Sequence, residues 1–524
     1  MNDSRFDASG WRWSLPPGTR LPDDLRGLLN DWNPYRPVGT LVKQNLQRRI
    51  ERIDLPSGTV FLKYTRVHSI RAWVRELLRK PKAELEFDSA RSLLSLGVPT
   101  AEPLAWGRMK QIGPADSVLI TREVAGAAVL ADVLEREMEP RDRRDVAVGL
   151  GELFGRCHDA GAIHPDPHPG NILHAADGTL VLLDVHSIRF GVPATWKEAS
   201  ANLVLLNRWF QLRASRADRQ RFWRSYSNRR TALGIDSKLA AKQLEVETER
   251  SNLQFWNKRL SRCFGKHRHY RPVSRGGVRG HIALEGPAIP WEAWLADPDA
   301  PFRDPAAQWL KDSRSSSVVR LPGGVVYKRF QIRSTLDLLK NGLRRSSALR
   351  SWQLGYALRD RGLPTPKPLF VAHRHRYGLP AEGYLATEEV PEVIGLPAYA
   401  AACDERERIR LAECLGRLVR LMHTRQVSHR DLKAANILMS RGEPVLIDLV
   451  GARVGSPIPE AIRDRDIARL HASFLSARRS LKLRFLKLYL STSNRAAWKS
   501  RWRSIDAATS AKVARNIRSG RPLA

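Results

Sequence analysis

The stretch VSHRDLKAANILMSRGEPVLIDLVG at residues 427–451 sets a polar string, HRDLKAAN, between two apolar runs. A looser form, IHPDPHPGNILHAADGTLVLLDVHS, stands earlier at 163–187. Each form has an aspartate, an asparagine five residues later and a second aspartate at the end of a short apolar run. Such a run predicts a buried strand with a carboxylate at its end. The chain therefore carries the pattern of one polar site twice.

The whole chain partly matches itself when it is shifted by about 265 residues. Asp166 follows Lys63 by 103 residues, and Asp431 follows Lys328 by the same 103 residues. The other matching blocks keep their order: FLKYTR with VYKRFQ, LLSLGVPTAEPLAWG with LRDRGLPTPKPLFVA, LITREV with LATEEV, and LVLLDV with PVLIDL. Ordered blocks at constant spacing indicate a tandem duplication.

Both copies predict the same order of elements. Short β-branched stretches come first, and an amphipathic helix follows at 83–96 and at 346–361, each ended by Gly-x-Pro. More strand comes next, then a helix over about 142–160 or 405–424. The polar loop, a short strand pair and further helices complete each copy. The pattern predicts an α+β protein.

Domain boundaries follow from the composition. We expect one domain at 35–262 and a second at 301–495. The Gly-, Pro-, Arg- and His-rich segment 263–300 is expected to be a linker, and 496–524 a basic C-terminal tail. A length of 524 residues agrees with more than one domain.

The charge balance is extreme, with 88 Lys and Arg against 54 Asp and Glu and a formal net charge of +34. Such a field attracts polyanions. Three stretches interleave cations with apolar residues, at 66–82, 333–350 and 478–503, as interfacial helices do. Each also fits the solvated face of an ordinary helix. Together they favour an anionic surface as a partner.

The compartment is indicated by cysteine and by hydropathy. Four scattered cysteines without a CxxC motif fit a reducing compartment. The first residues, MNDSRFDASGWRW, do not resemble a signal peptide, and the chain has no run of about 18 apolar residues. We expect a cytoplasmic protein, with attachment to a membrane surface left open.

The polar loop has the side chains that phosphoryl transfer requires. Asp431 can accept the proton of an attacking hydroxyl, and Lys433 can neutralise charge on the transferred group. Asn436 and Asp448 offer oxygen ligands, which Mg²⁺ prefers. Lys328, on a strand about a hundred residues upstream, can reach nucleotide phosphates. Positioning and electrostatics perform most of this catalysis.

The order strand-Lys, H-x-D-x-x-x-x-N, strand-Asp resembles the protein-kinase-like fold. HRDLKAANIL with VYKRF, and RSWQLGYALRDRGLPTPKPL at 350–369, resemble the bacterial lipopolysaccharide kinases, which phosphorylate heptose or 3-deoxy-octulosonic acid of the inner core. HPDPHPGNIL resembles the aminoglycoside-phosphotransferase and ABC1-type variants of the fold. The resemblance implies two kinase-like domains, each a small β-rich N-lobe plus a helical C-lobe. It also implies ATP and Mg²⁺ as cofactors.

The resemblance further implies a lipopolysaccharide precursor or another anionic glycolipid as acceptor, and a peripheral location on the inner membrane. It assigns roles residue by residue. The catalytic residues are Asp431 and Lys433 in the second copy and Asp166 and His168 in the first. The implied metal ligands are Asn436, Asp448, Asn171 and Asp184. The implied nucleotide-binding residues are Lys328, Lys63, Glu86 and the hinge residues Arg122, Glu123, Val124, Glu388, Glu389 and Val390.

Each copy departs from the kinase pattern at a different place. Glu86 fills the position of the helix glutamate that pairs with the strand lysine, whereas the second copy has Ser351 there. His168 stands where the second copy has Lys433. Neither copy has a glycine-rich phosphate loop, although a Ser-rich turn can also present N–H groups to phosphate. Which copy is active stays open.

Three other functions compete with a lipopolysaccharide sugar kinase. HRDLK also fits a protein Ser/Thr kinase. A tandem pseudokinase would act as a binding or scaffold module on an anionic surface. A nucleic-acid binder would use the basic surfaces and need no ATP. We expect nucleic acid to be an unlikely partner, because the kinase motifs would then have no use.

Overall fold

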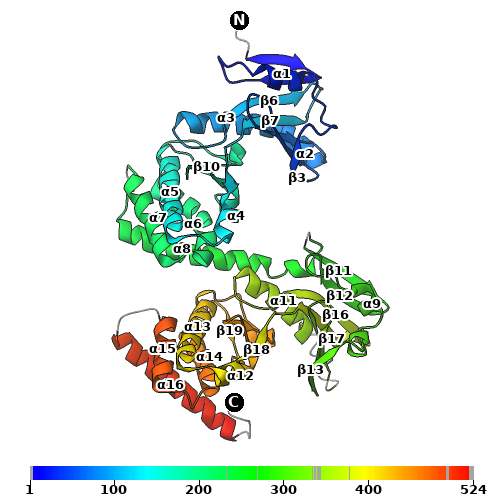
Figure 1. The fold of residues 1–524 in the computed structure, drawn as a ribbon, viewed down its shortest axis with the longest axis vertical. Helices are drawn as coiled ribbons and strands as arrows, with labels where there is room; N and C mark the ends of the chain where they lie inside the picture. The colour runs from blue at the N-terminus through cyan, green and yellow to red at the C-terminus, as the bar shows by residue number, and fades with distance from the viewer. Residues whose placement is uncertain are drawn as a thin grey trace. The chain divides into compact units, whose positions relative to one another are not determined.

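The computed structural model describes residues 4–518 apart from 232, 268, 333, 335–337, 339–343, 377 and 491–494; of residues 71–72 and 495–497 it describes the backbone only. The chain divides into two compact units, Met1–Ser251 and Asn252–Ala524. Each unit holds a β-sheet region followed by a mainly helical region (Figure 1). The predicted α+β class and the tandem arrangement are confirmed.

The sheet of the first unit has seven strands in the order β1-β2-β6-β7-β5-β4-β3, and every neighbouring pair is antiparallel. Helix α3 (Lys82–Ser95) packs against β6 and β7. The other elements of this region are β1 (Arg5–Ala8), β2 (Trp11–Ser14), α1 (Asp23–Asn30), β3 (Thr40–Gln44), β4 (Arg48–Ile53), β5 (Val60–Thr65), α2 (Ile70–Leu78), β6 (Pro103–Met109) and β7 (Ser117–Arg122).

The helical region of the first unit surrounds a small sheet of β8, β9 and β10. Helices α5 and α7 pack against each other. The elements are β8 (Ala128–Val129), α4 (Leu130–Glu135), α5 (Pro140–Asp159), β9 (Ile172–His174), β10 (Leu180–Leu182), α6 (Trp196–Arg213), α7 (Arg216–Arg229) and α8 (Ser237–Arg259). The boundary between the two units falls within α8, after Ser251.

The sheet of the second unit repeats the first strand for strand, in the order β11-β12-β16-β17-β15-β14-β13. Helix α11 (Ser347–Asp360) takes the place of α3 and packs against β16 and β17. The other elements are β11 (Tyr270–Arg275), β12 (Val278–Ala283), α9 (Trp291–Ala296), β13 (Gln308–Ser313), β14 (Ser316–Leu321), β15 (Val325–Phe330), β16 (Pro368–Arg376) and β17 (Leu379–Glu388).

The helical region of the second unit also encloses short strands, and α13 packs against α15 while α14 packs against α16. Its elements are β18 (Val393–Gly395), α12 (Leu396–Ala402), α13 (Glu405–Thr424), β19 (Ser428–His429), β20 (Ile437–Ser440), β21 (Glu443–Leu446), β22 (Ala452–Arg453), α14 (Glu460–Ala472), α15 (Arg479–Leu490) and α16 (Arg495–Arg518).

The helix predictions agree with the structure. The helices expected at 83–96 and 346–361 are α3 and α11, each 14 residues long. Both are followed by a left-handed glycine, Gly97 at φ +70° and Gly362 at φ +62°. A glycine after a helix adopts this conformation without the steric cost that a Cβ imposes, and it ends the helix there.

The expected domain boundaries are wrong at both sheets. Residues 263–300 are not a linker, because β11 and β12 pair with each other and β12 pairs with β16. The first domain likewise begins before residue 35, since β1 and β2 occupy the same place in the first sheet. The Arg- and Gly-rich composition obscured the alternation of buried and more exposed residues that identifies a strand. Val278, Gly280 and Ile282 face inward between exposed or half-buried residues.

The segment expected as a tail is also part of the second unit. Helix α16 buries Ile505 and joins α14 through Arg501 Nη2, 2.8 Å from Asp464 Oδ1. Within the basic stretch 478–503, helix α15 buries Phe485 and Leu486. These apolar residues therefore serve the core and not an external surface.

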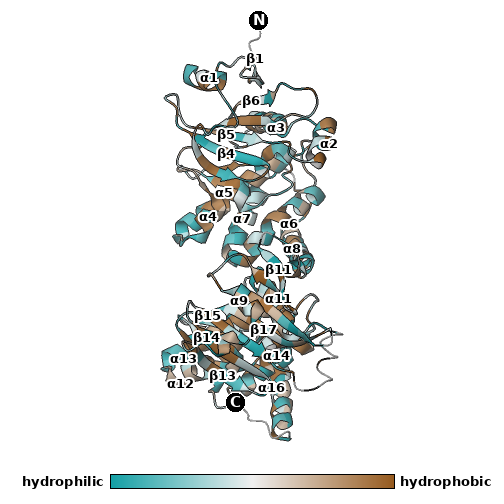
Figure 2. Cartoon of the chain, turned by 90° about the vertical axis from the view of Figure 1, so that its right-hand side faces the viewer, coloured by the Kyte–Doolittle hydropathy of each residue, from teal (hydrophilic) through white to brown (hydrophobic). Residues whose placement is uncertain are grey.

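Each lobe has its own hydrophobic core. The first sheet buries Trp11, Trp13 and Trp32 completely or nearly so, and the second buries Tyr327 and Phe370. Figure 2 shows hydrophobic residues distributed through the strands and helices of both units, as separate cores require. Across the part of the chain that the structure describes, no helix is both long enough and apolar enough to cross a bilayer.

Candidate active sites

The first site is built around a buried ion pair between the two residues predicted to pair. Lys63 on β5 places Nζ 2.7 Å from Glu86 Oε1 on α3, and both side chains are largely buried. Burial alone would raise the pKa of Glu86, but the charges of Lys63 and Arg48 outweigh it and lower the pKa. Glu86 is therefore ionised at neutral pH, as a partner for the lysine must be.

A second carboxylate, Asp184, lies on the other side of the same cluster. It follows β10 in the left-handed conformation at φ +57°, and a short 3₁₀ turn comes next. Its Oδ1 is contacted by Arg48 Nη1 at 3.1 Å, His186 Nδ1 at 3.2 Å and Lys82 Nζ at 3.8 Å. The close His186 ring, together with the cations, keeps the pKa of Asp184 far below its usual range.

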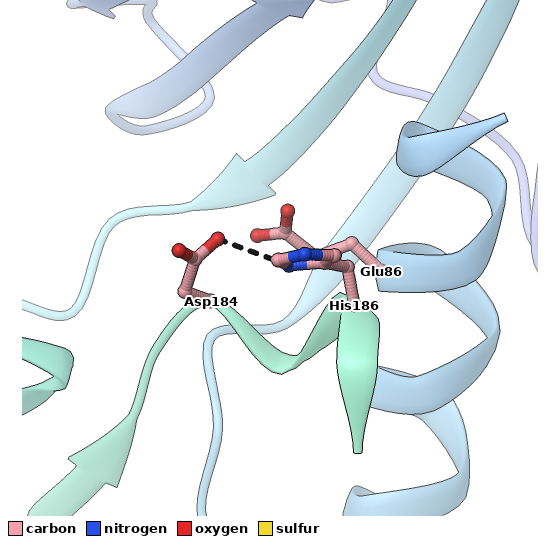
Figure 3. Close-up of side chains that lie close together, drawn as sticks. All are labelled: Glu86, Asp184 and His186. Atoms are coloured by element: carbon pink, nitrogen blue, oxygen red, sulfur yellow. Dashed lines mark ion pairs between the residues drawn. The ribbon is translucent and has the colours of Figure 1, made fainter. Parts of the chain in front are cut away.

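Glu86, Asp184 and His186 form the group of potential metal ligands found among the described residues (Figure 3). Lys63 and Arg48 already contact the two carboxylate oxygens of Glu86. Arg48 also contacts Asp184. Cationic side chains of the protein thus occupy the positions that a metal would compete for.

The polar loop of the first copy is held by histidines. His164 is buried, accepts the Asp166 N–H at Nδ1 and faces the Leu183 carbonyl at 3.1 Å through Nε2. Asn171 Nδ2 donates to the Asp166 carbonyl at 3.0 Å. His168 accepts the Gly170 N–H at Nδ1, and its Nε2 lies 3.5 Å from Asp166 Oδ2. The predicted His168 therefore lies beside the predicted base.

The second site has the same loop geometry. Asn436 Nδ2 donates to the Asp431 carbonyl at 2.8 Å and to Oδ2 at 3.1 Å. Lys433 Nζ lies 3.3 Å from Asp431 Oδ2. His429 is buried and accepts the Asp431 N–H at Nδ1, as His164 does in the first copy. The loop thus presents an exposed Asp431 carboxylate from a rigid backbone.

The strand lysine of the second copy has a different partner. Lys328 Nζ lies 3.0 Å from Asp448 Oδ1, and Asp448 has the same left-handed backbone as Asp184, at φ +54°. Burial would raise the pKa of Asp448, but Lys328 outweighs this and lowers it. Ser351 stands at the position of Glu86, is buried, and donates to the Ser347 carbonyl.

Two further residues of the first cluster, Arg48 and Lys82, were missed by sequence reasoning. Arg48 pairs with Thr65 at the start of β4, and the corresponding residue of β14, opposite Phe330, is Ser316. Lys82 is the first residue of α3, as Ser347 is of α11. The loop between β4 and β5 is longer than the loop between β14 and β15. The shift of about 265 residues that aligns Lys63 with Lys328 therefore does not align β4 with β14.

The predicted hinge segments begin at Arg122 and Glu388, the last residues of β7 and β17, and these strands pair with β5 and β15. The Glu123 N–H donates to the Thr59 carbonyl, and the Glu389 N–H to the Gly324 carbonyl. Their side chains pair with arginines, Glu123 with Arg52 and Glu389 with Arg320. The remaining hinge residues, Arg122, Val124, Glu388 and Val390, lie beside them in sequence.

Cavities adjoin the loop of the second copy. One of about 970 Å³ is lined by residues of α12 to α16 and reaches Asp431 and Lys433. A smaller one of about 500 Å³ also reaches Asp431. The equivalent cavity of the first copy, about 400 Å³, is lined by Met138, Trp209 and Phe210 among others, and Asp166 is not in its lining. The space beside the loop therefore differs between the copies.

Comparison with known proteins gives consistent matches. The family model described as lipopolysaccharide kinase (Kdo/WaaP) family matches residues 47–226 and 325–499. The lipopolysaccharide core heptose(I) kinase WaaP of Pseudomonas aeruginosa is 31% identical over 159 residues, which are 27% of this chain and 59% of that protein. The 3-deoxy-D-manno-octulosonic acid kinase of Xanthomonas oryzae pv. oryzae is 30% identical over 210 residues, 40% of this chain and 71% of that protein.

The chain thus spans about three fifths of the length of the heptose kinase that it matches. Among solved structures, the 2.2 Å crystal structure of WbdD aligns with a TM-score of 0.28 and 17% identity, covering 42% of this chain and 52% of that one.

Proposed function

Because this chain belongs to the lipopolysaccharide kinase (Kdo/WaaP) family, we propose that it transfers the γ-phosphoryl group of ATP to a sugar hydroxyl of a lipopolysaccharide inner-core precursor. The observation that carries the proposal is the Asp431 loop. An exposed carboxylate is held by Asn436 and flanked by Lys433, and a cavity opens beside it. A general base needs this combination of access and fixed orientation.

The proposed reaction is a direct displacement. Asp431 accepts the proton of the sugar hydroxyl, the hydroxyl oxygen bonds to the γ-phosphorus, and the bond from that phosphorus to ADP breaks. Lys433 and Lys328 stabilise the negative charge on the phosphoryl and nucleotide oxygens.

Asn436 and Asp448 would hold Mg²⁺. Asn436 donates through its nitrogen to Asp431, which leaves its oxygen as a donor to a cation, and Asp448 is ionised. Bound Mg²⁺ supplies charge neutralisation at the phosphates. In the absence of an α11 glutamate, Lys328 takes its counter-charge from Asp448 itself.

In the first copy we propose the same roles for Lys63, Glu86, Asp166, Asn171 and Asp184. Its lysine–glutamate pair is formed, whereas its metal-binding aspartate is engaged by Arg48. The first copy therefore has the lysine–glutamate pair that the second lacks, and the second has Lys433 beside its base where the first has His168. This difference supports a division of labour between nucleotide binding and transfer.

The proposal places the protein at the inner surface of a membrane that carries the acceptor. Helix α2 exposes an apolar stripe at the spacing of one helix face: Ile70, Trp73, Val74, Leu77 and Leu78. Exposed Arg75 and Arg79 flank the stripe. Such a helix suits an anionic interface. In Figure 2, α2 carries hydrophobic and hydrophilic residues side by side.

Other cations of the basic stretches 66–82 and 333–350 give less support to a membrane contact. The side chain of Arg71 and most of 333–343 lie outside the described residues. Arg345 bonds Gln353 and covers the Phe264 ring, whereas Arg344 is exposed. The support for a membrane surface therefore comes from α2.

The test is phosphate transfer from radiolabelled Mg²⁺-ATP to inner-core lipopolysaccharide from which phosphate has been removed. We expect transfer by the full chain, loss of transfer in Asp431→Asn, and a separate effect of Asp166→Asn. Absence of transfer by the unmodified chain, together with absence of thermal stabilisation by Mg²⁺-ATP, would overturn the proposal.

One alternative has specific support. Ser351 removes the usual partner of Lys328, and Arg48 occupies Asp184, as expected if neither copy were catalytic. A tandem pseudokinase would bind an anionic surface without transferring phosphate. Stabilisation by nucleotide without transfer to any sugar acceptor favours this alternative.

A further inference from the structure

The cavity of about 500 Å³ beside Asp431 has a strongly cationic lining. We call it the arginine cavity, and it is lined by Arg430, Asp431, Arg465, Ala468, Arg469, Ala508, Lys512, Arg515 and Asn516. The polar loop, α14 and α16 all contribute, so the charges converge from three elements. Five of the nine lining residues are Lys or Arg, and the one acidic residue is the proposed base.

Two of the cations of this cavity, Arg465 and Arg515, are not paired within the fold that the structure describes. Within the described part of the chain, the side chains of Arg465 and Arg515 form no ion pair or hydrogen bond. Arg469 does, 2.9 Å from Asp466 Oδ1, and Asp466 in turn accepts the His429 N–H. Arg469 thus supports the loop, whereas Arg465 and Arg515 are available to a ligand.

Arg430 also lies near other guanidinium groups. Burial, together with the charges of Arg430 and Arg453, lowers the pKa of Arg350 on α11. Clustered guanidinium groups repel one another, and a bound anion relieves the repulsion. Arginine also matches phosphate oxygens with paired donors.

The first copy lacks this charge. In the first copy, Asn202 of α6 donates to the carbonyl of the loop residue His164. In the second copy, Asp466 of α14 accepts the N–H of the corresponding loop residue, His429. Asn202 and Asp466 therefore occupy equivalent positions, and α6 can be aligned with α14. In that alignment Arg465 and Arg469 correspond to Ala201 and Leu205, and Arg430 corresponds to Pro165. The cations that the loop and α14 contribute to the lining therefore belong to one copy and are not a general property of the fold.

We propose that the arginine cavity binds a phosphate group already present on the acceptor, so that the second copy positions the acceptor hydroxyl at Asp431. This inference rests on the proposed function and adds two things to it. A phosphate of the acceptor is held in the cavity beside Asp431, and the first copy does not bind that acceptor group.

The experiment titrates inorganic phosphate into the full chain saturated with Mg²⁺ and a non-hydrolysable ATP analogue, followed by calorimetry. The test variant is Arg465→Gln/Arg515→Gln. Its matched control, Arg479→Gln/Arg484→Gln, removes two charges from α15, outside the cavity. We expect the test variant to bind phosphate at least about tenfold more weakly and the control to bind as the unmodified chain does.

A second arm uses vesicles of phosphatidylcholine with phosphatidic acid. Loss of vesicle binding in the test variant identifies a lipid headgroup as the phosphate source, and loss of inorganic phosphate binding alone identifies a soluble or sugar phosphate. Equal phosphate binding by the test variant and the unmodified chain, or equal weakening in the control, overturns the inference.

Folding and the proposed function are monitored separately. Circular dichroism and thermal unfolding of each variant show whether the fold is retained. If the two glutamine substitutions unfold the chain, Arg465→Lys/Arg515→Lys replaces them, because it keeps the charge and removes the paired guanidinium donors. A chain that binds phosphate at this cavity but transfers none from ATP contradicts the proposed function and leaves the anion site standing.

Discussion

Arg48 Nη1 lies 3.1 Å from Asp184 Oδ1, so an arginine of the sheet contacts the aspartate that the kinase resemblance assigns to the metal. The same guanidinium contacts Glu86 Oε2 at 3.3 Å. In the second copy the corresponding residue is Ser316, and Lys328 contacts Asp448 directly. The two proposed nucleotide sites therefore hold different numbers of cations.

Arg48→Ser is expected to make the first site bind Mg²⁺ more readily, because the guanidinium competes with the metal for Asp184. In an Asp448→Asn background, the Mg²⁺ concentration that half-saturates stabilisation by a non-hydrolysable ATP analogue should fall about fivefold, equivalent to ~1 kcal/mol. Arg12→Ser on β2 of the same sheet, whose arginine pairs with Asp7, is the control. An unchanged Mg²⁺ requirement contradicts the competition.

Glu86→Gln should destabilise the first unit strongly. Its carboxylate is the buried partner of Lys63, and the substitution leaves the lysine and Arg48 with a neutral amide. Removing one member of a buried pair costs about 3 kcal/mol in the free energy of unfolding. Ser351→Ala, at the same position of the second copy, should cost less than about 1 kcal/mol, since only one hydroxyl is lost. Denaturant unfolding of both variants checks the contrast.

Ser351→Glu should strengthen nucleotide binding by the second copy. The introduced carboxylate competes with Asp448 for Lys328 and leaves Asp448 available to Mg²⁺. The measurement is stabilisation by Mg²⁺ and the ATP analogue in an Asp184→Asn background, compared with Ser351→Gln, which has the same shape without charge. Equal stabilisation of the two variants would show that Lys328 does not need a helix glutamate.

The free energy of unfolding should fall as pH drops from 6.5 towards 4. Burial lowers the pKa of His158 from 6.5 to about 4, and the ring contacts Tyr226 and Asn202. The folded state thus binds this proton less tightly than the unfolded chain. The contribution of neutral His158 to the free energy of unfolding is therefore fully present above pH 6.5. Acidification removes it, with a limit of about 3 kcal/mol for this pKa change. Thermal unfolding across this pH range should show a shallower dependence in His158→Gln.

Trp73→Ser/Leu77→Ser should weaken binding to vesicles that contain phosphatidylglycerol by about tenfold, because both side chains belong to the exposed stripe of α2. Leu94→Ser/Leu96→Ser removes exposed apolar surface elsewhere in the first unit and serves as the control. Vesicle sedimentation measures both. If the control loses as much affinity, α2 is not a specific contact.

The motifs predicted much of the fold, because local physics determines them. Gly97 and Gly362 end their helices through their own backbone conformation, which does not depend on distant residues. The spacing of apolar residues along α3 and α11 is likewise set by residues close together in sequence. Strands β11 and β12 escaped detection because β12 joins the sheet by pairing with β16, about ninety positions away in the sequence, and β11 pairs only with β12. Arg-rich composition is typical of a linker until that partner strand is known.

The sequence by itself determined the duplication, the α+β class and the loop residues Asp166, Asn171, Asp431 and Asn436, because each depends on order and spacing along the chain. Only the tertiary structure decided what surrounds them. Arg48 and Lys82 reach Asp184 from other elements, and Arg465 and Arg515 line the same cavity as Asp431 from α14 and α16. Side chains distant in sequence meet through packing and strand register, and electrostatics depends on those distances and not on sequence separation.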